Sequence, residues 1–157
     1  MRAATAAVET WVAEPLVRFI DDARVRLVLL LESSGRVLAQ HGFTRSIDVM
    51  SACALAAAIH ASAAEIGRQL DGTPFKTMHH PGRERQIFLG ELATGHGAHI
   101  LLTVFDDATS IGLVRLYFAE LSRRLAGAAA ATSSAPPTLV DFESDLNRNL
   151  AKLFGRI

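Results

Sequence analysis

The sequence lacks the features of secreted and membrane-bound proteins. It contains one cysteine, Cys53, in an alanine-rich run, so no internal disulfide can form and a reducing compartment is favoured. The N-terminal segment has no apolar core of a signal peptide, and no stretch without Asp, Glu, Lys or Arg is longer than residues 49–64. That stretch is shorter than the roughly 20 residues that a membrane span needs. We therefore predict a soluble, cytoplasmic protein that does not insert into a membrane.

A net charge is also missing. The 16 basic and 16 acidic side chains give a formal net charge of zero, so the sequence has no electrostatic footprint for nucleic acid or for an anionic membrane. The 157 residues, of which 50% are hydrophobic, suffice for one domain with a buried core and an appended element. A partner surface on this protein is therefore expected to rest on shape and apolar contact.

The motifs of catalysis and metal binding are absent as well. The sequence contains no phosphate-binding loop, no nucleophile elbow and no dinucleotide fingerprint. His79, His80, His96 and His99 have no accompanying set of cysteines or carboxylates at the spacing of a metal site. In a strand, His79 and His80 would also point to opposite faces. The sequence predicts no catalytic residue, no metal and no cofactor, and thus a protein that is not an enzyme.

What the sequence does contain is an abrupt change of hydrophobic period at a pair of aspartates. Residues 100–105 are almost continuously apolar and rich in strand formers, as in a central strand covered on both faces. After Asp106 and Asp107 the apolar residues recur every three or four positions, which is typical of a helix. They are Ile111, Val114, Phe118, Leu121 and Leu125. Because Asp107, Thr109 or Ser110 can cap that helix, we interpret the paired carboxylates as structural rather than as metal ligands or acid and base catalysts.

Patterning elsewhere completes the predicted order of elements. We expect a helix over 6–22, strands over 24–31 and 37–41, a long helix over 46–70, strands over 75–80, 86–92 and 98–105, and a helix ending near 125. Pro15 should kink the first helix or mark its real start. Strands joined by hairpins, with helices between them, predict an α/β sandwich with a mostly antiparallel five-stranded sheet and helices on both faces.

The long helix over 46–70 is apolar on two sides. Large apolar residues occupy one set of helical positions and alanines another: Leu55, Ile59, Ile66 and Leu70, and Ala54, Ala57, Ala61 and Ala64. A helix that is apolar all round has to be covered twice. One cover is the chain's own sheet, and the other is either a partner or the C-terminal end of this chain.

The C-terminal end carries a separate amphipathic pattern. We divide the chain into a domain over 1–126, a linker over 127–138 and an amphipathic helix over 139–157. The apolar positions of that helix are Leu139, Phe142, Leu146, Leu150, Leu153, Phe154 and Ile157. It can dock on its own core, insert into a partner groove or lie on a membrane, and its balanced charge disfavours the membrane.

Three segments resemble a known family. Residues 29–39, 79–89 and 104–116, together with the order of elements, resemble the roadblock/dynein light chain family, and within it the bacterial MglB-type group. The resemblance extends over about residues 8–125. It implies a roadblock, profilin-like fold and a homodimer that binds a small Ras-like GTPase of the MglA type. It also implies that GTP hydrolysis is stimulated by repositioning the GTPase's own catalytic residues, in cell polarity or motility.

The resemblance also implies where partners bind. The second helix corresponds to the element at which family dimers meet and which helps to form the surface for the GTPase, and a row of alanines would allow close helix approach. The predicted interface residues are Met50, Ala54, Ala57, Ala61, Ala64 and Arg68. The residues predicted to contact a partner from the C-terminal helix are Phe142, Leu146, Leu150, Leu153 and Phe154.

Alternatives to this function remain at the level of sequence. Arg83 and Arg85 fall in a predicted exposed turn and could supply an arginine finger, but the family's mode of action argues against one. A roadblock adaptor that only scaffolds a complex is a second possibility. A small-molecule sensor is a third, and it requires a concave pocket with a few converging polar groups, which the sequence does not identify.

Overall fold

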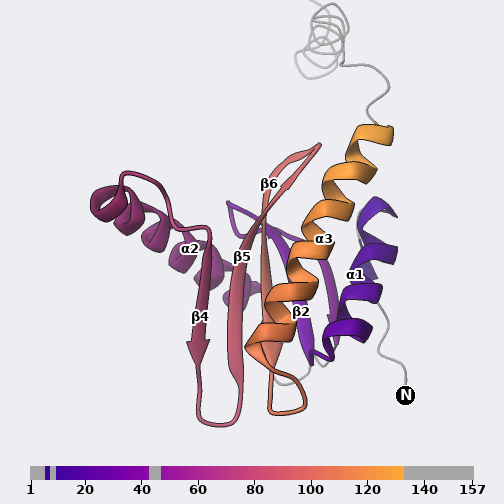
Figure 1. The fold of residues 1–157 in the computed structure, drawn as a ribbon, viewed down its shortest axis with the longest axis horizontal. Coiled ribbons are helices and arrows are strands. Elements are labelled where there is room, and N and C mark those ends of the chain that lie inside the picture. Colours follow the sequence, from indigo (N-terminus) through magenta and orange to yellow (C-terminus); the bar gives the residue numbers. More distant parts are fainter. Residues whose placement is uncertain (1–5, 8–9, 43–46, 133–157) are drawn as a thin grey trace, which may run out of the picture.

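The sheet of this protein has six strands and a helix layer on each face. The structure is a computed structural model that describes residues 6–7, 10–42 and 47–132 (Figure 1). The strands are β1 (Ala6–Ala7), β2 (Leu27–Glu32), β3 (Val37–Gly42), β4 (Thr77–Pro81), β5 (Gln86–Thr94) and β6 (Gly97–Phe105). Their order across the sheet is β1-β3-β2-β6-β5-β4, and all neighbours are antiparallel. The predicted α/β sandwich with five main antiparallel strands is confirmed, and β1 adds a short sixth strand.

The first helix begins later than predicted. Residues 6 and 7 pair with Gln40 and Ala39 at the outer edge of β3, and α1 covers Thr10–Ala23. The prediction of helix from residue 6 was wrong because an open strand edge offers these backbone groups hydrogen-bonding partners. Pro15 lies inside α1 and does not mark its start.

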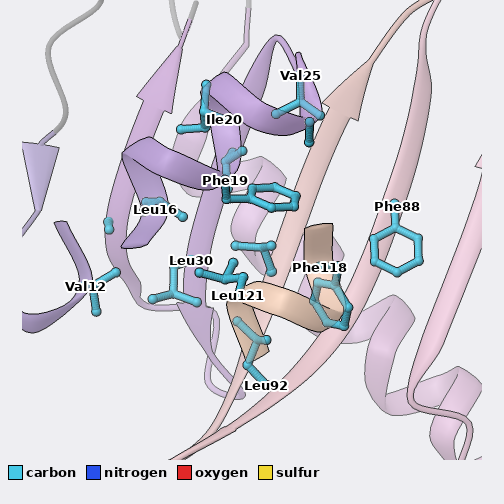
Figure 2. Packing of buried hydrophobic residues seen from close by; sticks show 14 of the residues in the cluster. Val12, Leu16, Phe19, Ile20, Val25, Leu30, Phe88, Leu92, Phe118 and Leu121 are labelled. Carbon is cyan, nitrogen blue, oxygen red and sulfur yellow. The ribbon is translucent and has the colours of Figure 1, made fainter. Parts of the chain in front are cut away.

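The central strands are covered on both faces. Val28 and Leu30 of β2 pack with α1 and α3 (Ile111–Thr132), whereas Leu27, Leu29 and Leu31 pack beneath α2 (Val49–Asp71). Figure 2 shows side chains of α1 and α3 converging on Leu30, Phe88 and Leu92. This double coverage explains the nearly unbroken apolar runs of β2 and β6, because each alternate residue meets a different helix layer.

The two helix layers use side chains of very different size. The layer of α1 and α3 contributes large side chains such as Leu16, Phe19 and Phe118 to the core. The buried residues of α2 are all small: Cys53, Ala56, Ala57, Ala64 and Gly67. Small residues let α2 approach the sheet closely, and the helix leaves most of its own surface uncovered.

Both helices after the first hairpin have side-chain caps at their start. Oδ1 of Asp48 accepts hydrogen bonds from the backbone N–H of Met50 and Ser51 at 3.1 and 3.3 Å, so α2 begins at Val49 rather than at Ser46. Oγ of Ser110 accepts from the backbone N–H of Leu113 at 3.3 Å. Of the three predicted candidates at the aspartate corner, Ser110 is therefore the cap of α3.

The C-terminal boundary of the domain also differs from the prediction. Helix α3 continues to Thr132, so the expectation that a linker begins at residue 127 was wrong. The sequence from Ala126 onward is dominated by alanine, the residue with the highest helix propensity, and no proline follows before Pro136. The remainder of the predicted linker and the whole C-terminal helix lie outside the described residues.

Candidate functional site

The aspartate corner has a structural role. Oδ2 of Asp106 accepts a hydrogen bond from Nε of Arg26 at 2.7 Å, and Oδ1 accepts from the backbone N–H of Ala108 at 3.0 Å. The Ala108 N–H first, and the Arg26 guanidinium second, hold the pKa of Asp106 below its usual range. A carboxylate with both oxygens engaged fastens the β6–α3 turn to the chain before β2, as the structural interpretation of the pair expects.

This contact predicts a pH-dependent effect on stability. A lowered folded-state pKa stabilises the protein above the ordinary carboxyl pKa of 3.8, and the contribution is lost as the pH falls through the folded value. Asp106→Asn should therefore unfold at lower urea concentration than the wild type at neutral pH, and the difference should close under acid conditions. Asp107→Asn is the matched control, because the described residues give Asp107 no hydrogen bond or ion pair. If the urea midpoints of the wild type and Asp106→Asn differed equally at neutral and acid pH, the role of the Asp106 carboxylate would be contradicted.

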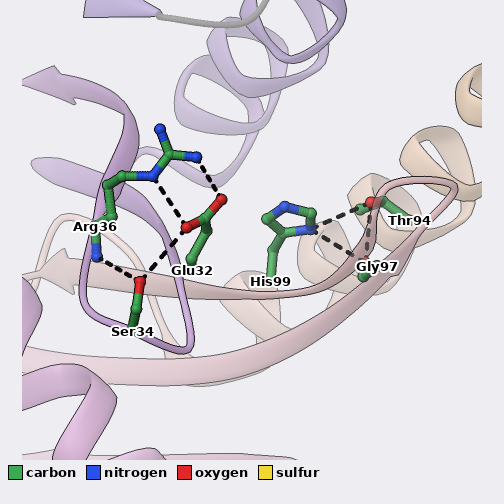
Figure 3. Close-up of polar contacts among 6 residues, drawn as sticks. All are labelled: Glu32, Ser34, Arg36, Thr94, Gly97 and His99. Carbon is green, nitrogen blue, oxygen red and sulfur yellow. Dashed lines mark hydrogen bonds and ion pairs between the residues drawn. The ribbon is translucent and has the colours of Figure 1, made fainter. Parts of the chain in front are cut away.

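The four histidines considered as metal ligands have other partners or stand apart. His79 lies 2.7 Å from Oε1 of Gln86, and His96 stacks on Trp11 with ring centroids 4.7 Å apart. Nδ1 of His99 lies 3.1 Å from the carbonyl oxygen of Gly97 and 3.2 Å from Oγ1 of Thr94, as Figure 3 shows. Because a carbonyl only accepts, this Nδ1 carries the proton. Within the described residues, no three histidine, cysteine or acidic side chains converge as a metal site would require.

Helix α2 carries most of the large apolar side chains that are exposed in the described part of the chain. Five large apolar side chains on this helix are between 37% and 80% exposed: Met50, Leu55, Ile59, Ile66 and Leu70. Four of them, Leu55, Ile59, Ile66 and Leu70, form one stripe, which we call the leucine flank. Among the described helices, α2 alone is long and apolar enough to cross a membrane by length and composition, a criterion that core helices of soluble proteins also meet. A continuous apolar stripe of this kind is typical of a surface that another protein covers.

The predicted interface residues on α2 differ in how deeply they are buried. Ala57 and Ala64 are 8% and 7% exposed and belong to the side of the helix that packs on the sheet. Met50, Ala54, Ala61 and Arg68 are exposed. Two members of the row of alanines are therefore covered by the chain's own sheet, whereas Ala54 and Ala61 remain exposed. The sequence identified the large residues of the leucine flank but offered no way to tell which side faced outward.

Strand β4 lies at the outer edge of the sheet, next to α2. It pairs with β5 on one side, and the described residues provide no strand on its other side (Figure 1). An open edge with free N–H and C=O groups is a template for pairing with another chain. The leucine flank and the β4 edge are thus two uncovered surfaces in the same part of the molecule.

A hollow of about 300 Å³ lies on the other side of α2. Its walls include Ala61 and Arg68 of α2, Glu91 of β5, and Ala98 and Ile100 of β6. At its base, Nε2 of His60 lies 3.0 Å from Oε2 of Glu91. This Nε2 is buried and lacks a hydrogen-bond partner of good geometry, so its contact with Glu91 is a close approach without the alignment of a hydrogen bond.

The two arginines considered as arginine fingers lie at the opposite end of the sheet. Arg83 and Arg85 are exposed in the β4–β5 turn and line a hollow of about 470 Å³ with Asp106 and Asp107. Charges of both signs therefore meet there. No described residue pairs with either arginine.

The comparison with solved structures identifies the fold. Myxococcus xanthus MglB is 26% identical, with a TM-score of 0.68, covering 75% of this chain and 94% of that chain. The gliding protein MglB of Thermus thermophilus is 22% identical, with a TM-score of 0.67, covering 83% and 97%. An MglB structure described as having a tetrameric arrangement is 21% identical, with a TM-score of 0.67, covering 83% and 96%. No protein-family model and no curated protein matches the chain.

These findings define the class of protein. The antiparallel sheet, with α1 and α3 on one face and α2 on the other, is the α/β sandwich of the roadblock class, and the chain resembles the roadblock family. Within that family it resembles MglB in particular. The resemblance expected from the sequence is confirmed.

Proposed function

We propose that this protein is a homodimeric regulator of a small Ras-like GTPase, and that it acts by contact rather than by chemistry of its own. The observation that carries the proposal is the uncovered apolar surface of α2 in a chain similar to MglB. One solved relative is described as a gliding protein, which supports a role in cell polarity or motility. A cytoplasmic location is part of the same proposal.

The dimer is proposed to form through the leucine flank and the edge of β4. Leu55, Ile66 and Leu70 are more than half exposed, and large side chains of this kind supply most of the apolar area at a stable interface. In a twofold dimer the same patch of both subunits forms the interface, so the leucine flank packs against the leucine flank of the second copy, and β4 pairs with its β4. A second copy of this chain therefore satisfies both uncovered surfaces at once.

A GTPase assay tests the proposed function. The purified full-length protein is mixed with the Ras-like GTPase of the MglA type from the same genome, and phosphate release is measured. We expect faster GTP hydrolysis that saturates with increasing protein, and Arg83→Ala and Arg85→Ala should each leave the acceleration intact because the GTPase uses its own residues.

Two outcomes would contradict the proposal at different points. Acceleration abolished by only one of the two arginine substitutions would establish an arginine finger worth about 10³ to 10⁵ in rate. No acceleration at saturating protein would exclude an activator. Binding that does not depend on whether GTP or GDP is loaded would then identify a roadblock adaptor that only scaffolds a complex.

A further inference from the structure

The hollow beside α2 is open and carries an incompletely satisfied carboxylate. Glu91 lies on β5, and its side chain is 30% exposed. Its Oε2 faces His60, whereas the described residues provide no hydrogen-bond or ion-pair partner for Oε1. A carboxylate has several lone pairs on its two oxygens, so Glu91 can accept donors from a bound group while it keeps its contact with His60.

The charge of the surrounding walls favours a cation. Arg68 also lines the hollow, but its Nη1 lies 3.0 Å from Oε2 of Glu65, so its guanidinium is directed at that carboxylate. The same pairing to Arg68, after the hydrogen bond from Gln69, lowers the pKa of Glu65. Among the residues that line the hollow, Glu91 is the one carboxylate, and it is therefore the group that can attract a cation.

The shape of the hollow favours a group with an aliphatic stem. Apart from the charged and polar residues, its walls are apolar and mostly small: Ala57, Ala61, Ala64, Pro74, Ala98 and Ile100. A volume of about 300 Å³ is at the small end of the range for ligand sites. Long basic side chains bury their methylene stems along apolar surface and present a charged head to an acceptor.

We infer that this hollow receives an arginine side chain from a partner protein, with the guanidinium on Glu91 and the stem along the alanines of α2. Arginine fits better than lysine because its guanidinium is more weakly hydrated than an ammonium group and loses less on entering a partly buried ion pair. The inference deepens the proposed function, since it names the chemistry by which the GTPase is recognised. It also separates two surfaces of α2, with the leucine flank for a second copy and the hollow for the partner.

The test uses an isolated arginine as a probe. Nα-acetyl-arginine N-methylamide is titrated into the full-length protein, and the backbone amide NMR signals of Ala61, Ala64 and Glu91 are followed. We expect saturable shifts with the wild type and binding weakened about tenfold or more by Glu91→Gln, as for loss of a charge-assisted hydrogen bond. Glu84→Gln, in the exposed β4–β5 turn, is the matched control and should bind like the wild type.

The competing outcomes are distinct. Shifts that do not saturate, equal binding by wild type and Glu91→Gln, or equal binding of the uncharged norleucine analogue would each overturn the inference. Because no GTPase is present, the result does not depend on the activation assay. If the wild type does not bind the arginine probe but does accelerate GTP hydrolysis, this inference alone is overturned. If it binds the probe but does not accelerate GTP hydrolysis, only the proposed activation is overturned.

Discussion

Acidic residues on the leucine flank are expected to turn the proposed dimer into monomers. In Leu55→Glu/Ile66→Glu, two exposed apolar side chains are replaced by carboxylates that the interface would have to bury without partners. We expect the dissociation constant of the dimer to rise by about 100-fold or more, the effect of losing buried anchors at the centre of an interface. Sedimentation equilibrium over a range of protein concentrations measures the change, and circular dichroism verifies that the variant is folded.

A control substitution on α2 distinguishes the leucine flank from the row of alanines as the dimer surface. Ala54 is exposed on the side of α2 away from the leucine flank, so Ala54→Glu introduces the same charge on the same helix. We expect this variant to remain dimeric. If Ala54→Glu forms monomers and the double variant does not, the alanine row rather than the leucine flank is the dimer surface, and the proposal made here is wrong.

The sequence predicted the layers of the fold because each layer depends on local periodicity. The continuous apolar runs of β2 and β6 require cover on both faces, and the helical spacing from Ile111 to Leu125 identifies the helix that follows Phe105. The corner at Asp106 could be interpreted as structural because capping is a local matter. The hydrogen bond from Arg26, 80 positions away, could not be predicted from it.

The orientation of α2 could not be derived from the sequence. Periodicity shows that this helix has two apolar sides, but small residues suit both close packing on a sheet and close packing on another helix. The structure resolves the choice for Ala57 and Ala64, which lie against the sheet. The same limit applies to His60 and Glu91, whose contact depends on how α2 lies across β5.

Gly67 is the position at which the packing of α2 against the segment leading into β4 can be tested most directly. It lies on the buried side of the helix, where Phe75 folds back over it after the helix ends. A Cβ atom at Gly67 would lie 2.4 Å from the backbone nitrogen of Phe75 and 2.8 Å from its ring. A flexible side-chain end could move away from such a contact, but a backbone nitrogen cannot move without shifting the segment that leads into β4.

Gly67→Ala is therefore expected to destabilise the protein, although glycine to alanine within a helix is ordinarily favourable. Overpacking of this kind costs about 1–3 kcal/mol, which exceeds the gain in helix propensity. Gly127→Ala in α3 is the matched control, because nothing lies within 4 Å of the added Cβ, and it should stabilise by about 1 kcal/mol. Urea unfolding of both variants measures the difference. Stabilisation by Gly67→Ala equal to that by Gly127→Ala would mean that α2 does not lie as close to Phe75 as described, and the surfaces assigned to the leucine flank and the hollow would have to be redrawn.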